Sequence, residues 1–540
     1  MRSFLLGAGG VLGLAVAAGA ASGQCWEPGI GTPGLNGDAN ASVVWDPDGA
    51  GPMHGELVVG GGFTTAGGVT VNRIARWNGA SWVGFGMGMS GSVFALTVGP
   101  GGDLVAGGSF TTAGGVTVNR IARWNGTAWS GFGTGMNDIV NAVTVDDSGD
   151  LIAGGRFSTA GGTPVNRIAR WDGSAWQPLG GGVGGTPPFY IVSLHSEVNG
   201  DLYAGGFFST AGGAPANNIA RWDGASWSPM GSGINGVVNA ITNHNGDIVA
   251  GGQFTNPGPI IQNYVARWTG TSWTNLGSGL GPVPGSFVWT MTTTSQGDLV
   301  VGGTFSTAGG QPANYIAMWD GVSWAPLGSG TSGFVRTITN MVNARLAVGG
   351  AFTTAGGAPA SRIAQYAYGD VDPVVSLDPE SEAACPGVPA VFTVGAFGGE
   401  PLAYQWQWQE SAGPVWNNLT EGANAAAGGT IIAAGTQTDT LTLTTDGPGA
   451  RLRAVVSNFC GSDTSAEAEL TIGGGCCDSI DFNGDGLFPD NQDLEDFFSV
   501  FGGGPCSTGT CGDIDFNNDG LFPDNIDLEA MLSVFGGGAC

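Results

Sequence analysis

The chain has 540 residues and contains no lysine, so arginine supplies all 15 of its basic side chains. Aspartate and glutamate number 43, and the formal net charge is −28 at pH 7. Binding to nucleic acids and to anionic lipids depends on clusters of basic side chains. The composition therefore argues against both partners, whereas an acidic surface suits solubility and the binding of cations.

Long hydrophobic segments are also scarce. One apolar stretch runs from Phe4 to Ala21 behind Arg2, and it is interrupted by glycine and ends in small residues. This pattern is typical of a secretory signal peptide, and it is short and glycine-rich for a membrane-spanning helix. We expect residues 1–23 to be removed and the mature protein to be secreted or held at the cell surface, without membrane insertion. Its 8 cysteines are then expected to be largely oxidised.

Histidine is rare as well, with three residues, His54, His195 and His244, at unrelated positions. A zinc or copper site would require such ligands to converge on one point, and nothing in their spacing favours this. We interpret them as residues of turns and strand ends.

One repeated phrase is abundant, and it explains much of the glycine content of 103 residues. It reads Gly-Gly-x-Phe-Thr/Ser-Thr-Ala-Gly-Gly, then Asn-Arg-Ile-Ala-Arg-Trp, then a turn and a second Trp. A complete copy contains four short strands separated by turn signals, as in a propeller blade. The seven phenylalanines that mark the copies are Phe63, Phe110, Phe157, Phe208, Phe254, Phe305 and Phe352.

The two ends of the repeat array complement each other. The seventh copy stops at Tyr366 without a fourth strand, and a matching segment, Trp26-Glu-Pro-Gly, stands at the beginning. A strand from the N-terminus that completes the last sheet would close the ring and leave no free edge. The sequence therefore predicts a mainly β fold with a seven-bladed β-propeller over residues 24–369.

The paired glycines after an apolar strand, followed by two tryptophans, resemble the kelch-type propeller family. In one copy the residues that carry this resemblance are Leu104 to Gly108, Trp124 and Trp129. Trp171-Asp172 spells the dipeptide of another propeller family, but no Gly-His pair precedes it. We interpret that aspartate as a turn residue.

Several repeated polar residues invite a functional reading. Aspartate follows glycine at the first hairpin in Asp103, Asp150, Asp201, Asp247 and Asp298. Turn chemistry explains these residues better than a glycosidase pair, for which Asp146 and Asp147 would be examples. The arginines that precede the first Trp are expected to pack between blades, against an aromatic ring or a carbonyl. They are Arg76, Arg123, Arg170, Arg221 and Arg267, and Met318 and Gln365 replace them in the last two copies.

No residue is predicted to be catalytic, and the Asp box of sialidases is absent. Most of the 18 tryptophans occupy repeat positions and are expected in the core. Trp45 and Trp289 lie outside the pattern. They are the better candidates for a binding face.

Residues 371–473 lack the repeat and contain short alternating strands, which predict a β-sandwich. The phrase Tyr404-Gln-Trp and the segment from Val456 to Cys460 resemble an immunoglobulin-like domain of bacterial extracellular proteins. The usual pair of cysteines between the sheets is missing. Cys385 and Cys460 are the only cysteines in this part, and we expect them to bond to each other.

Residues 474–540 contain a second repeat, in which an acidic loop precedes an amphipathic helix and a Gly-Gly-Gly stop. Asp, Asn and Asp at loop positions 1, 3 and 5, Gly at 6 and a backbone carbonyl at 7 form the pattern of a calcium loop. A solvated acidic linker is the alternative, and duplication of loop and helix disfavours it. The predicted ligands of two calcium ions are Asp481, Asn483, Asp485, Leu487, Asp493, Asp515, Asn517, Asp519, Leu521 and Asp527.

The sequence leaves two alternatives for the last calcium ligand of each loop. Position 12 falls on Gln492 and Ile526, which lack a carboxylate, so the loop must be longer by one residue to reach Asp493 and Asp527. The alternatives are Asp490 and Asp524.

The duplicated loop and helix resemble the dockerin family, which implies a protein partner, either a cohesin-like module or another cell-surface protein. The cysteines repeat with the loops, and the simplest disulfides are Cys477–Cys506 and Cys511–Cys540. Cys25 and Cys476 have no assigned partner.

The sequence thus predicts a non-enzymatic binding or scaffold protein, whose propeller binds a glycan or protein and whose tail docks it at the cell surface. The first alternative is an extracellular hydrolase or oxidase that acts on polysaccharide. The second is a purely structural role in a surface layer.

Overall fold

The computed structural model falls into two compact units, Met1–Val371 and Asp372–Cys540. In the first unit it describes residues 25–27, 30, 33–47, 55–254, 264–281, 286–342 and 344–368. In the second it describes residues 372–384, 387–398, 402–410, 415–426, 429–445, 449–458, 460–472, 482, 491–505, 507, 528–529 and 531–532. Within these ranges, no helix combines the length and hydropathy that a membrane crossing requires.

The described part of the first unit contains seven four-stranded antiparallel sheets, which we number 1 to 7 in chain order. Sheet 1 consists of β2 (Ala39–Trp45), β3 (Glu56–Gly61), β6 (Ile74–Trp77) and β7 (Trp82–Gly84), and sheet 2 of β8 (Val93–Val98), β9 (Leu104–Gly108), β12 (Ile121–Trp124) and β13 (Trp129–Gly131). Sheet 3 consists of β14 (Val140–Val145), β15 (Leu151–Gly155), β18 (Ile168–Trp171) and β19 (Trp176–Pro178), and sheet 4 of β21 (Tyr190–Ser196), β22 (Leu202–Phe207), β25 (Ile219–Trp222) and β26 (Trp227–Pro229). Sheet 5 consists of β27 (Val237–His244), β28 (Asp247–Gln253), β29 (Val265–Trp268) and β30 (Trp273–Asn275), and sheet 6 of β31 (Val288–Thr293), β32 (Leu299–Gly303), β35 (Ile316–Trp319) and β36 (Trp324–Pro326). Sheet 7 consists of β37 (Val335–Met341), β38 (Arg345–Gly350), β41 (Ile363–Ala367) and β1 (Cys25–Glu27).

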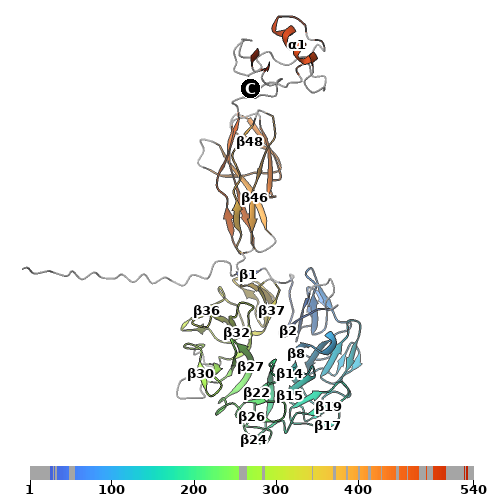
Figure 1. Cartoon of the computed structure of the whole chain (residues 1–540). Coiled ribbons are helices and arrows are strands. Elements are labelled where there is room, and N and C mark those ends of the chain that lie inside the picture. Colours follow the sequence, from blue (N-terminus) through green and yellow to red (C-terminus); the bar gives the residue numbers. More distant parts are fainter. Residues whose placement is uncertain are drawn as a thin grey trace, which may run out of the picture. The chain divides into compact units, whose positions relative to one another are not determined.

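The sheets follow one another around a ring in the order of the chain (Figure 1). The first strand of each sheet is the innermost, and it contacts the first strands of the two neighbouring sheets, with β2 also contacting β37. The Thr-Ala-Gly-Gly loops form short hairpins, such as β10 (Thr112–Ala113) with β11 (Val116–Thr117). The others are β4 (Thr65–Ala66) with β5 (Val69–Thr70), β16 (Thr159–Ala160) with β17 (Thr163–Pro164), β23 (Thr210–Ala211) with β20 (Val183–Gly184) and β24 (Ala214–Pro215), β33 (Thr307–Ala308) with β34 (Gln311–Pro312), and β39 (Thr354–Ala355) with β40 (Ala358–Pro359).

The second strand of each sheet is buried on both faces, which explains its continuous apolar run and its final glycine pair. In sheet 2, a Cβ on Gly107 would lie 2.6 Å from Cγ1 of Val140 in sheet 3. A Cβ on Gly108 would lie 2.1 Å from the carbonyl oxygen of Ser92. Both positions therefore require glycine, because no other residue permits so close an approach of the neighbouring backbone and side chain.

The second Trp of each repeat links one sheet to the preceding one. Its indole Nε1–H donates a hydrogen bond to a backbone carbonyl there, so the buried ring keeps a partner for its one polar group. The donor and acceptor pairs, at 2.8 to 3.1 Å, are Trp26–Leu327, Trp82–Ile30, Trp129–Phe85, Trp176–Phe132, Trp227–Leu179, Trp273–Met230 and Trp324–Leu276.

The strand at the N-terminus belongs to the last sheet. β1 pairs antiparallel with β41, with Trp26 opposite Tyr366. Through this strand the chain of indole hydrogen bonds continues from sheet 6 to sheet 7 and, from Trp82 to Ile30, on to sheet 1. No sheet of the described ring is left without this link.

The repeated arginines and the repeated acidic residues form ion pairs within the sheets. This corrects the prediction that the arginines chiefly pack against a ring or a carbonyl, although Arg123 also lies 5.5 Å from the ring centre of Phe132. The pairs are Arg76–Glu56 (2.7 Å), Arg123–Asp103 (3.8 Å), Arg170–Asp150 (3.5 Å), Arg221–Asp201 (2.8 Å) and Arg267–Asp247 (3.5 Å). Sheet 7 reverses the arrangement, since Arg345 stands on the second strand and pairs with Glu27 of β1.

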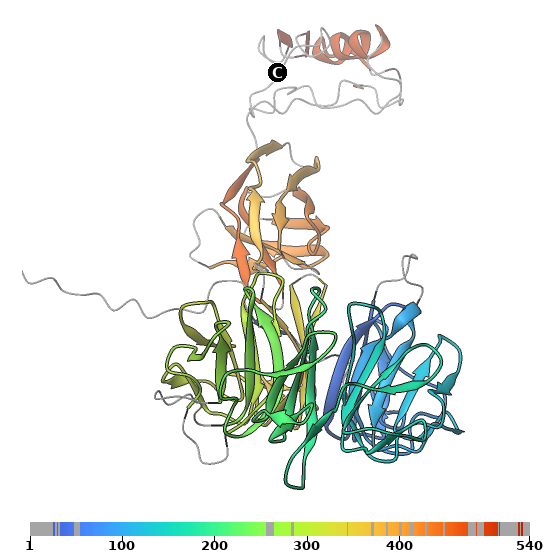
Figure 2. The same ribbon diagram turned by 60° about the horizontal axis from the view of Figure 1, so that its bottom comes forward.

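The second unit contains two facing sheets with one hydrophobic core, visible as the orange strands of Figure 2. One sheet consists of β43 (Glu382–Ala384), β53 (Ala468–Ile472), β51 (Ala450–Ser457), β46 (Ala403–Glu410), β47 (Asn417–Asn418) and β52 (Ser462–Thr464). The other consists of β44 (Ala390–Thr393), β50 (Thr440–Thr445), β49 (Gly429–Ala434) and β48 (Gly422–Ala426), and β42 (Val374–Leu377) pairs with β45 (Gly395–Phe397). Trp406 is fully buried, and its Nε1 donates to the carbonyl of Thr438 at 2.9 Å.

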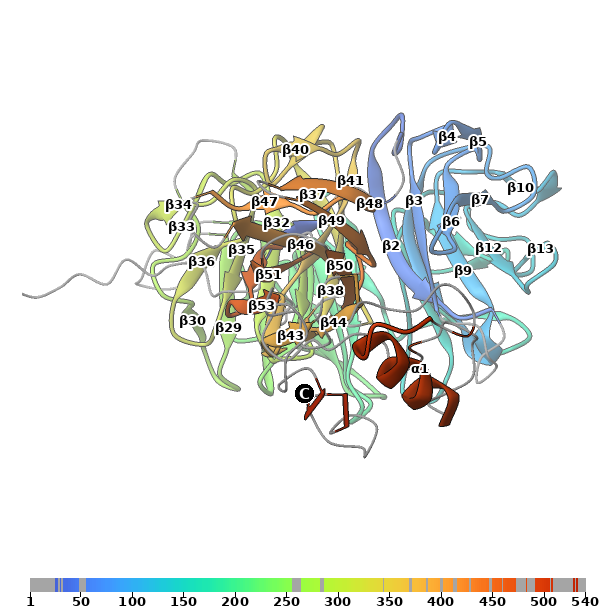
Figure 3. The same ribbon diagram turned by 90° about the horizontal axis from the view of Figure 1, so that it is seen from above.

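Among its described residues, the tail of the second unit contains helix α1 (Asn491–Phe501), labelled in Figure 3. Phe497 is buried on this helix and meets the ring of Phe482 edge-to-face at 5.2 Å. The buried Asp496 accepts a hydrogen bond at 2.8 Å from the backbone N–H of Ser507, which follows the helix. An aromatic contact and a buried carboxylate thus hold the short segment around α1.

Candidate binding site

The first strand of every sheet carries a β-bulge near its start. In β8, for example, Val93 pairs with Gly108 and Ala95 with Gly107, so Phe94 has no partner in the register. A bulge turns the extra side chain away from the regular alternation of the strand. The seven bulged residues are Asn40, Phe94, Asn141, Val192, Asn239, Trp289 and Arg336.

The glycine pair of the repeat lies opposite the bulge and makes it possible. In sheet 3, Gly155 pairs with Val140 and Gly154 with Ala142, on either side of Asn141. A Cβ on Gly155 would lie 2.1 Å from the carbonyl oxygen of Ile139. The repeated Gly-Gly therefore marks, in the sequence, the place where each sheet turns one side chain out of its core.

All seven bulged side chains line a single cavity of about 500 Å³. Because each comes from the innermost strand of a different sheet, the cavity lies at the centre of the ring. The other lining residues are Ile139, Arg156, Tyr190, Val237, Gln253 and Phe287. The walls thus combine aromatic rings, amides and two guanidinium groups.

The bulged residues alternate around the cavity. Sheets 1, 3 and 5 contribute asparagines, whose Nδ2 groups donate to carbonyls of the next sheet: Asn40 to Val93 at 3.3 Å, Asn141 to Ile191 at 2.8 Å, and Asn239 to Val288 at 2.8 Å. Sheets 2, 4 and 6 contribute Phe94, Val192 and Trp289. Anchored amides therefore alternate with apolar groups, and Arg336 of sheet 7 completes the ring.

Two donors in this wall have no hydrogen-bond partner. They are the indole Nε1 of Trp289 and the Nε of Arg336, and both atoms are buried. The guanidinium of Arg336 also lies 5.7 Å from the ring centre of Trp289. Leaving a buried donor unpaired costs about 1–3 kcal/mol, so the wall of the cavity is built at some cost to the stability of the fold.

Of the two tryptophans predicted for a binding face, Trp289 lines the cavity, whereas the prediction for Trp45 is wrong. Trp45 is 2% exposed, and its Nε1 donates to the carbonyl of Gly102 at 2.8 Å. Its ring packs near Phe85 at 5.9 Å. A position outside the repeat pattern thus belongs to the core in one case and to the cavity in the other.

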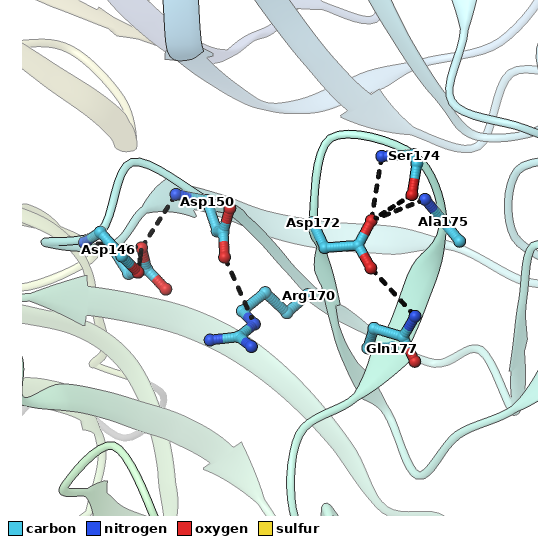
Figure 4. Close-up of polar contacts among 8 residues, drawn as sticks. Asp146, Asp150, Arg170, Asp172, Ser174, Ala175 and Gln177 are labelled. Atoms are coloured by element: carbon cyan, nitrogen blue, oxygen red, sulfur yellow. Dashed lines mark hydrogen bonds and ion pairs between the residues drawn. The ribbon is translucent and has the colours of Figure 1, made fainter.

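The aspartates near Asp146 are explained by turn geometry and pairing (Figure 4). Asp146 accepts from the backbone N–H groups of Ser148 and Asp150, and Asp150 faces Arg170. Burial raises the pKa of Asp150, Asp146 raises it further, and Arg170 opposes the shift. These contacts assign a structural part to Asp146 and Asp150.

Asp172, the aspartate of the Trp-Asp dipeptide, holds its turn as predicted. It accepts from the backbone N–H groups of Ala175 and Ser174 at 2.8 and 2.9 Å, and from Gln177 at 3.0 Å (Figure 4). The hydrogen bonds from Ala175 and then Ser174 are the main reason that its pKa lies well below the ordinary value.

The two described histidines, His195 and His244, lie on neighbouring sheets, and neither lines the cavity. His195 on β21 contacts Glu197 at 2.8 Å, and Asn243 of β27 donates to the same carboxylate at 2.9 Å. His244 is 3% exposed, and burial lowers its pKa. His54 lies outside the described residues, within which no three potential metal ligands among His, Cys, Asp and Glu gather.

Of the predicted calcium ligands, only Asp493 lies within the described residues. It stands in the first turn of α1, and its side chain is fully buried. The other predicted ligands, outside the described residues, are Asp481, Asn483, Asp485, Leu487, Asp515, Asn517, Asp519, Leu521 and Asp527. The rivals Asp490 and Asp524 lie there too.

Cys25 and Cys460 are both disulfide-bonded. The predicted partner of Cys460, Cys385, lies outside the described residues. The predicted bonds Cys477–Cys506 and Cys511–Cys540 likewise fall outside them. Oxidised cysteine therefore occurs in both units.

Comparison with known proteins supports the β-propeller. A family model described as a β-propeller domain of unknown function, DUF5122, matches residues 55–79, which span β3 to β6. The search of curated proteins gave no match. Among solved structures, a crystal structure of titin domain M4 is similar at 21% identity and a TM-score of 0.14, over 19% of this chain and 99% of that one. The extracellular domain of a hybrid two-component system from B. thetaiotaomicron is similar at 10% identity and a TM-score of 0.29, over 81% of this chain and 69% of that one. TM-scores this low carry no argument about function.

Apart from Trp289, the bulge positions were missed by reasoning from the sequence. They stand between an apolar and a small residue, as in Val93-Phe-Ala and Val288-Trp-Thr, seven times. The signal that would have found them is variation, because the flanking residues are shared among the copies and the central one is not.

Proposed function

We propose that this protein is an exported binding protein whose first unit, a seven-bladed kelch-like β-propeller, holds an extracellular ligand in its central cavity. One observation carries the proposal. Every sheet sends one side chain into the same cavity by the same bulge, and those side chains differ where the rest of the repeat is shared. Concave sites with apolar walls and a few placed polar groups are typical of ligand binding.

The ligand classes that suit the walls are a glycan and a protein segment. Trp289, Phe287 and Phe94 provide ring surfaces, and the amides and arginines provide polar contacts. Aromatic rings combine a large contact area with defined geometry, which makes them frequent anchors in binding sites.

The second unit is proposed to connect and attach this binding module. Residues 371–473 act as an immunoglobulin-like spacer, which agrees with the two sheets around Trp406. Residues 474–540 act as a dockerin-like tail with two calcium ions, docking to a cohesin-like or other cell-surface protein. The buried Asp493 on α1 supports the calcium assignment, since 13 acidic residues and no basic one follow position 473.

The test of the binding function is a glycan array and a turnover assay, both with the mature full-length protein. Binding without hydrolysis or oxidation is expected, and Trp289→Ala should abolish it while Arg267→Ala, outside the cavity, should leave it intact. Turnover of a polysaccharide would instead establish the alternative enzymatic function. Absence of any glycan or protein ligand would leave the structural surface-layer role.

The calcium proposal is tested separately. Calorimetric titration of the metal-free full-length protein should give two bound calcium ions per chain, with a gain of helix signal by circular dichroism. Asp493→Asn should weaken one of the two sites. Titration without heat and without a change in helix signal would refute the assignment.

A further inference from the structure

The lining of the central cavity differs in charge from the rest of the protein. The whole chain carries a formal net charge of −28. The described residues that line the cavity include Arg156 and Arg336 and neither aspartate nor glutamate. A cavity lined by one sign of charge concentrates ligands of the opposite sign, because its low-dielectric walls focus the field. A positive cavity in so acidic a protein therefore points to an anionic ligand.

Arg336 is only partly neutralised by its surroundings. Its Nη2 lies 3.5 Å from the carboxylate of Asp38, and the Nε of Arg362 lies 3.8 Å from the same carboxylate. One acidic group is thus shared between two guanidinium groups, and the Nε of Arg336 remains without a hydrogen-bond partner. The cluster of these three side chains retains a net positive charge.

Arg156 provides a second, more open guanidinium. It is an exposed residue, and its guanidinium carbon lies 4.8 Å from the ring centre of Tyr190, which also lines the cavity. Stacking on an aromatic face leaves the in-plane N–H groups of arginine available, and their fork matches the two oxygens of a carboxylate.

The two arginines belong to sheets that are not neighbours in the ring. Arg156 follows β15 of sheet 3, and Arg336 lies on β37 of sheet 7. Sheets 1 and 2 separate them in one direction, and sheets 4 to 6 in the other. A ligand that contacts both therefore spans the cavity and carries anionic groups at more than one place along its length.

The wall between the arginines favours a sugar chain. Phe94, Val192 and Trp289 alternate with Asn40, Asn141 and Asn239, so apolar and amide groups follow one another around the cavity. A sugar ring likewise has apolar C–H faces and a polar edge of hydroxyl groups. Trp289 offers a ring face, which suits the apolar face of a sugar ring.

We propose that the cavity binds a carboxylate-bearing oligosaccharide, with carboxylates held by Arg156 and Arg336 and a sugar ring stacked on Trp289. This inference rests on the proposed binding function and narrows its ligand to uronate-containing glycans. The carboxylates form charge-assisted hydrogen bonds with the guanidinium forks, while the aromatic ring binds charged and neutral sugars alike.

The experiment is isothermal titration calorimetry of the mature full-length protein with hexasaccharides of galacturonate, mannuronate and guluronate. Their methyl-esterified forms keep the sugar backbone and lack the charge, so they are the matched neutral probes. Sulfated hexasaccharides and a peptide with a free C-terminal carboxylate form the two further arms. We expect one uronate series to bind, with an affinity at least about 10-fold above its ester, as the loss of a charged hydrogen bond implies.

The variants separate charge from stacking. Arg156→Gln and Arg336→Gln should each lower the affinity for the uronate about 10- to 100-fold and that for the ester little. Arg336→Lys keeps the charge without the fork, so it should recover part of the loss. Trp289→Ala should weaken both ligands, and Arg267→Gln, whose partner is Asp247 outside the cavity, is the matched control. Thermal melting of every variant checks that the fold is retained.

The remaining outcomes distinguish a failure of the carboxylate inference from a failure of the proposed binding function. Equal binding of uronate and ester, with loss in Trp289→Ala alone, would overturn the carboxylate inference and leave glycan binding in place. A preference for the sulfated sugar or for the peptide would also overturn it. If no hexasaccharide and no peptide binds, the proposed binding function fails as well.

Discussion

The outer strands of the sheets carry the same residue in every copy, whereas the bulges at the centre carry different residues. Trp176 of the outer edge has an equivalent in every sheet, and each such indole bonds to the preceding sheet. At the bulge, asparagine, phenylalanine, valine, tryptophan and arginine stand in one and the same structural position. Shared residues thus assemble the ring, whereas divergent residues give the cavity its chemistry.

This difference shows that one repeat can both assemble the ring and vary the chemistry of its cavity. The bulge itself is repeated, because each glycine pair leaves room for it, but its side chain is free to vary. A substitution of Phe94, Val192 or Trp289 alters the cavity without removing a hydrogen bond between sheets, whereas the three bulged asparagines also bond to the next sheet.

The largest effect on stability is expected from truncating a phenylalanine that all seven copies share. Phe157 is fully buried, so Phe157→Ala should lower the free energy of unfolding by about 3–5 kcal/mol. Phe94→Ala at the bulge removes the same side chain from the cavity wall and should cost much less. Urea unfolding followed by tryptophan fluorescence measures both, and equal losses would contradict the distinction.

The second-largest effect on stability is expected from the ion pair between Arg345 of β38 and Glu27 of β1. Arg345 and Glu27 are 18% and 10% exposed, whereas Arg123 and Asp103 are 47% and 25% exposed. A charge-assisted hydrogen bond contributes more where it is shielded from solvent, so Glu27→Ala should cost about 1.5–3 kcal/mol. Asp103→Ala, in an exposed pair, should cost less than about 1 kcal/mol. The reverse order in a denaturation series would show that β1 does not depend on this pair.

The link between glycine and bulge can be tested in sheet 3. A Cβ on Gly155 would overlap the carbonyl oxygen of Ile139, so Gly155→Ala should destabilise the protein by about 1–3 kcal/mol and disturb the cavity. Gly131→Ala is the control, since its Cβ would meet nothing closer than 3.5 Å. Ligand affinity should fall in the first variant and not in the second.

The smallest effect concerns pH. Burial lowers the pKa of His244, so below about pH 6.5 the unfolded chain binds a proton that the folded protein does not yet bind. Stability should therefore fall as the pH drops from 6.5 towards the folded pKa, by at most about 1.4 kcal/mol per pH unit for one proton. Unfolding curves between pH 7 and pH 5 measure this slope. A slope that is unchanged in His244→Gln would assign it to other groups.

Reasoning from the sequence found those features that depend on shared residues. The repeats predict strands and turns directly, and the likeness of Trp26 to the second Trp of the other copies predicts the strand that pairs with β41. Contacts between residues on different strands were harder to predict. Arg170 and Asp150 have equivalents in other copies, yet their ion pair depends on the register of β15 and β18.

The cavity escaped prediction for a related reason. Trp45 and Trp289 look equally irregular in the sequence, but only the bulge turns Trp289 out of the core. A bulge is one extra residue in a strand, and alternation of side chains cannot locate it without the partner strand.

The pairing of β1 with β41 also sets an order of events in folding. Cys25 pairs with Ala367, so the first strand to be synthesised finds its place only after the last sheet exists. Contacts this distant in sequence form slowly, because a long loop has to be closed before they are gained. The ring is therefore completed last where the three residues of β1 pair with β41. Hydrogen exchange should detect opening of the ring first at these backbone amides.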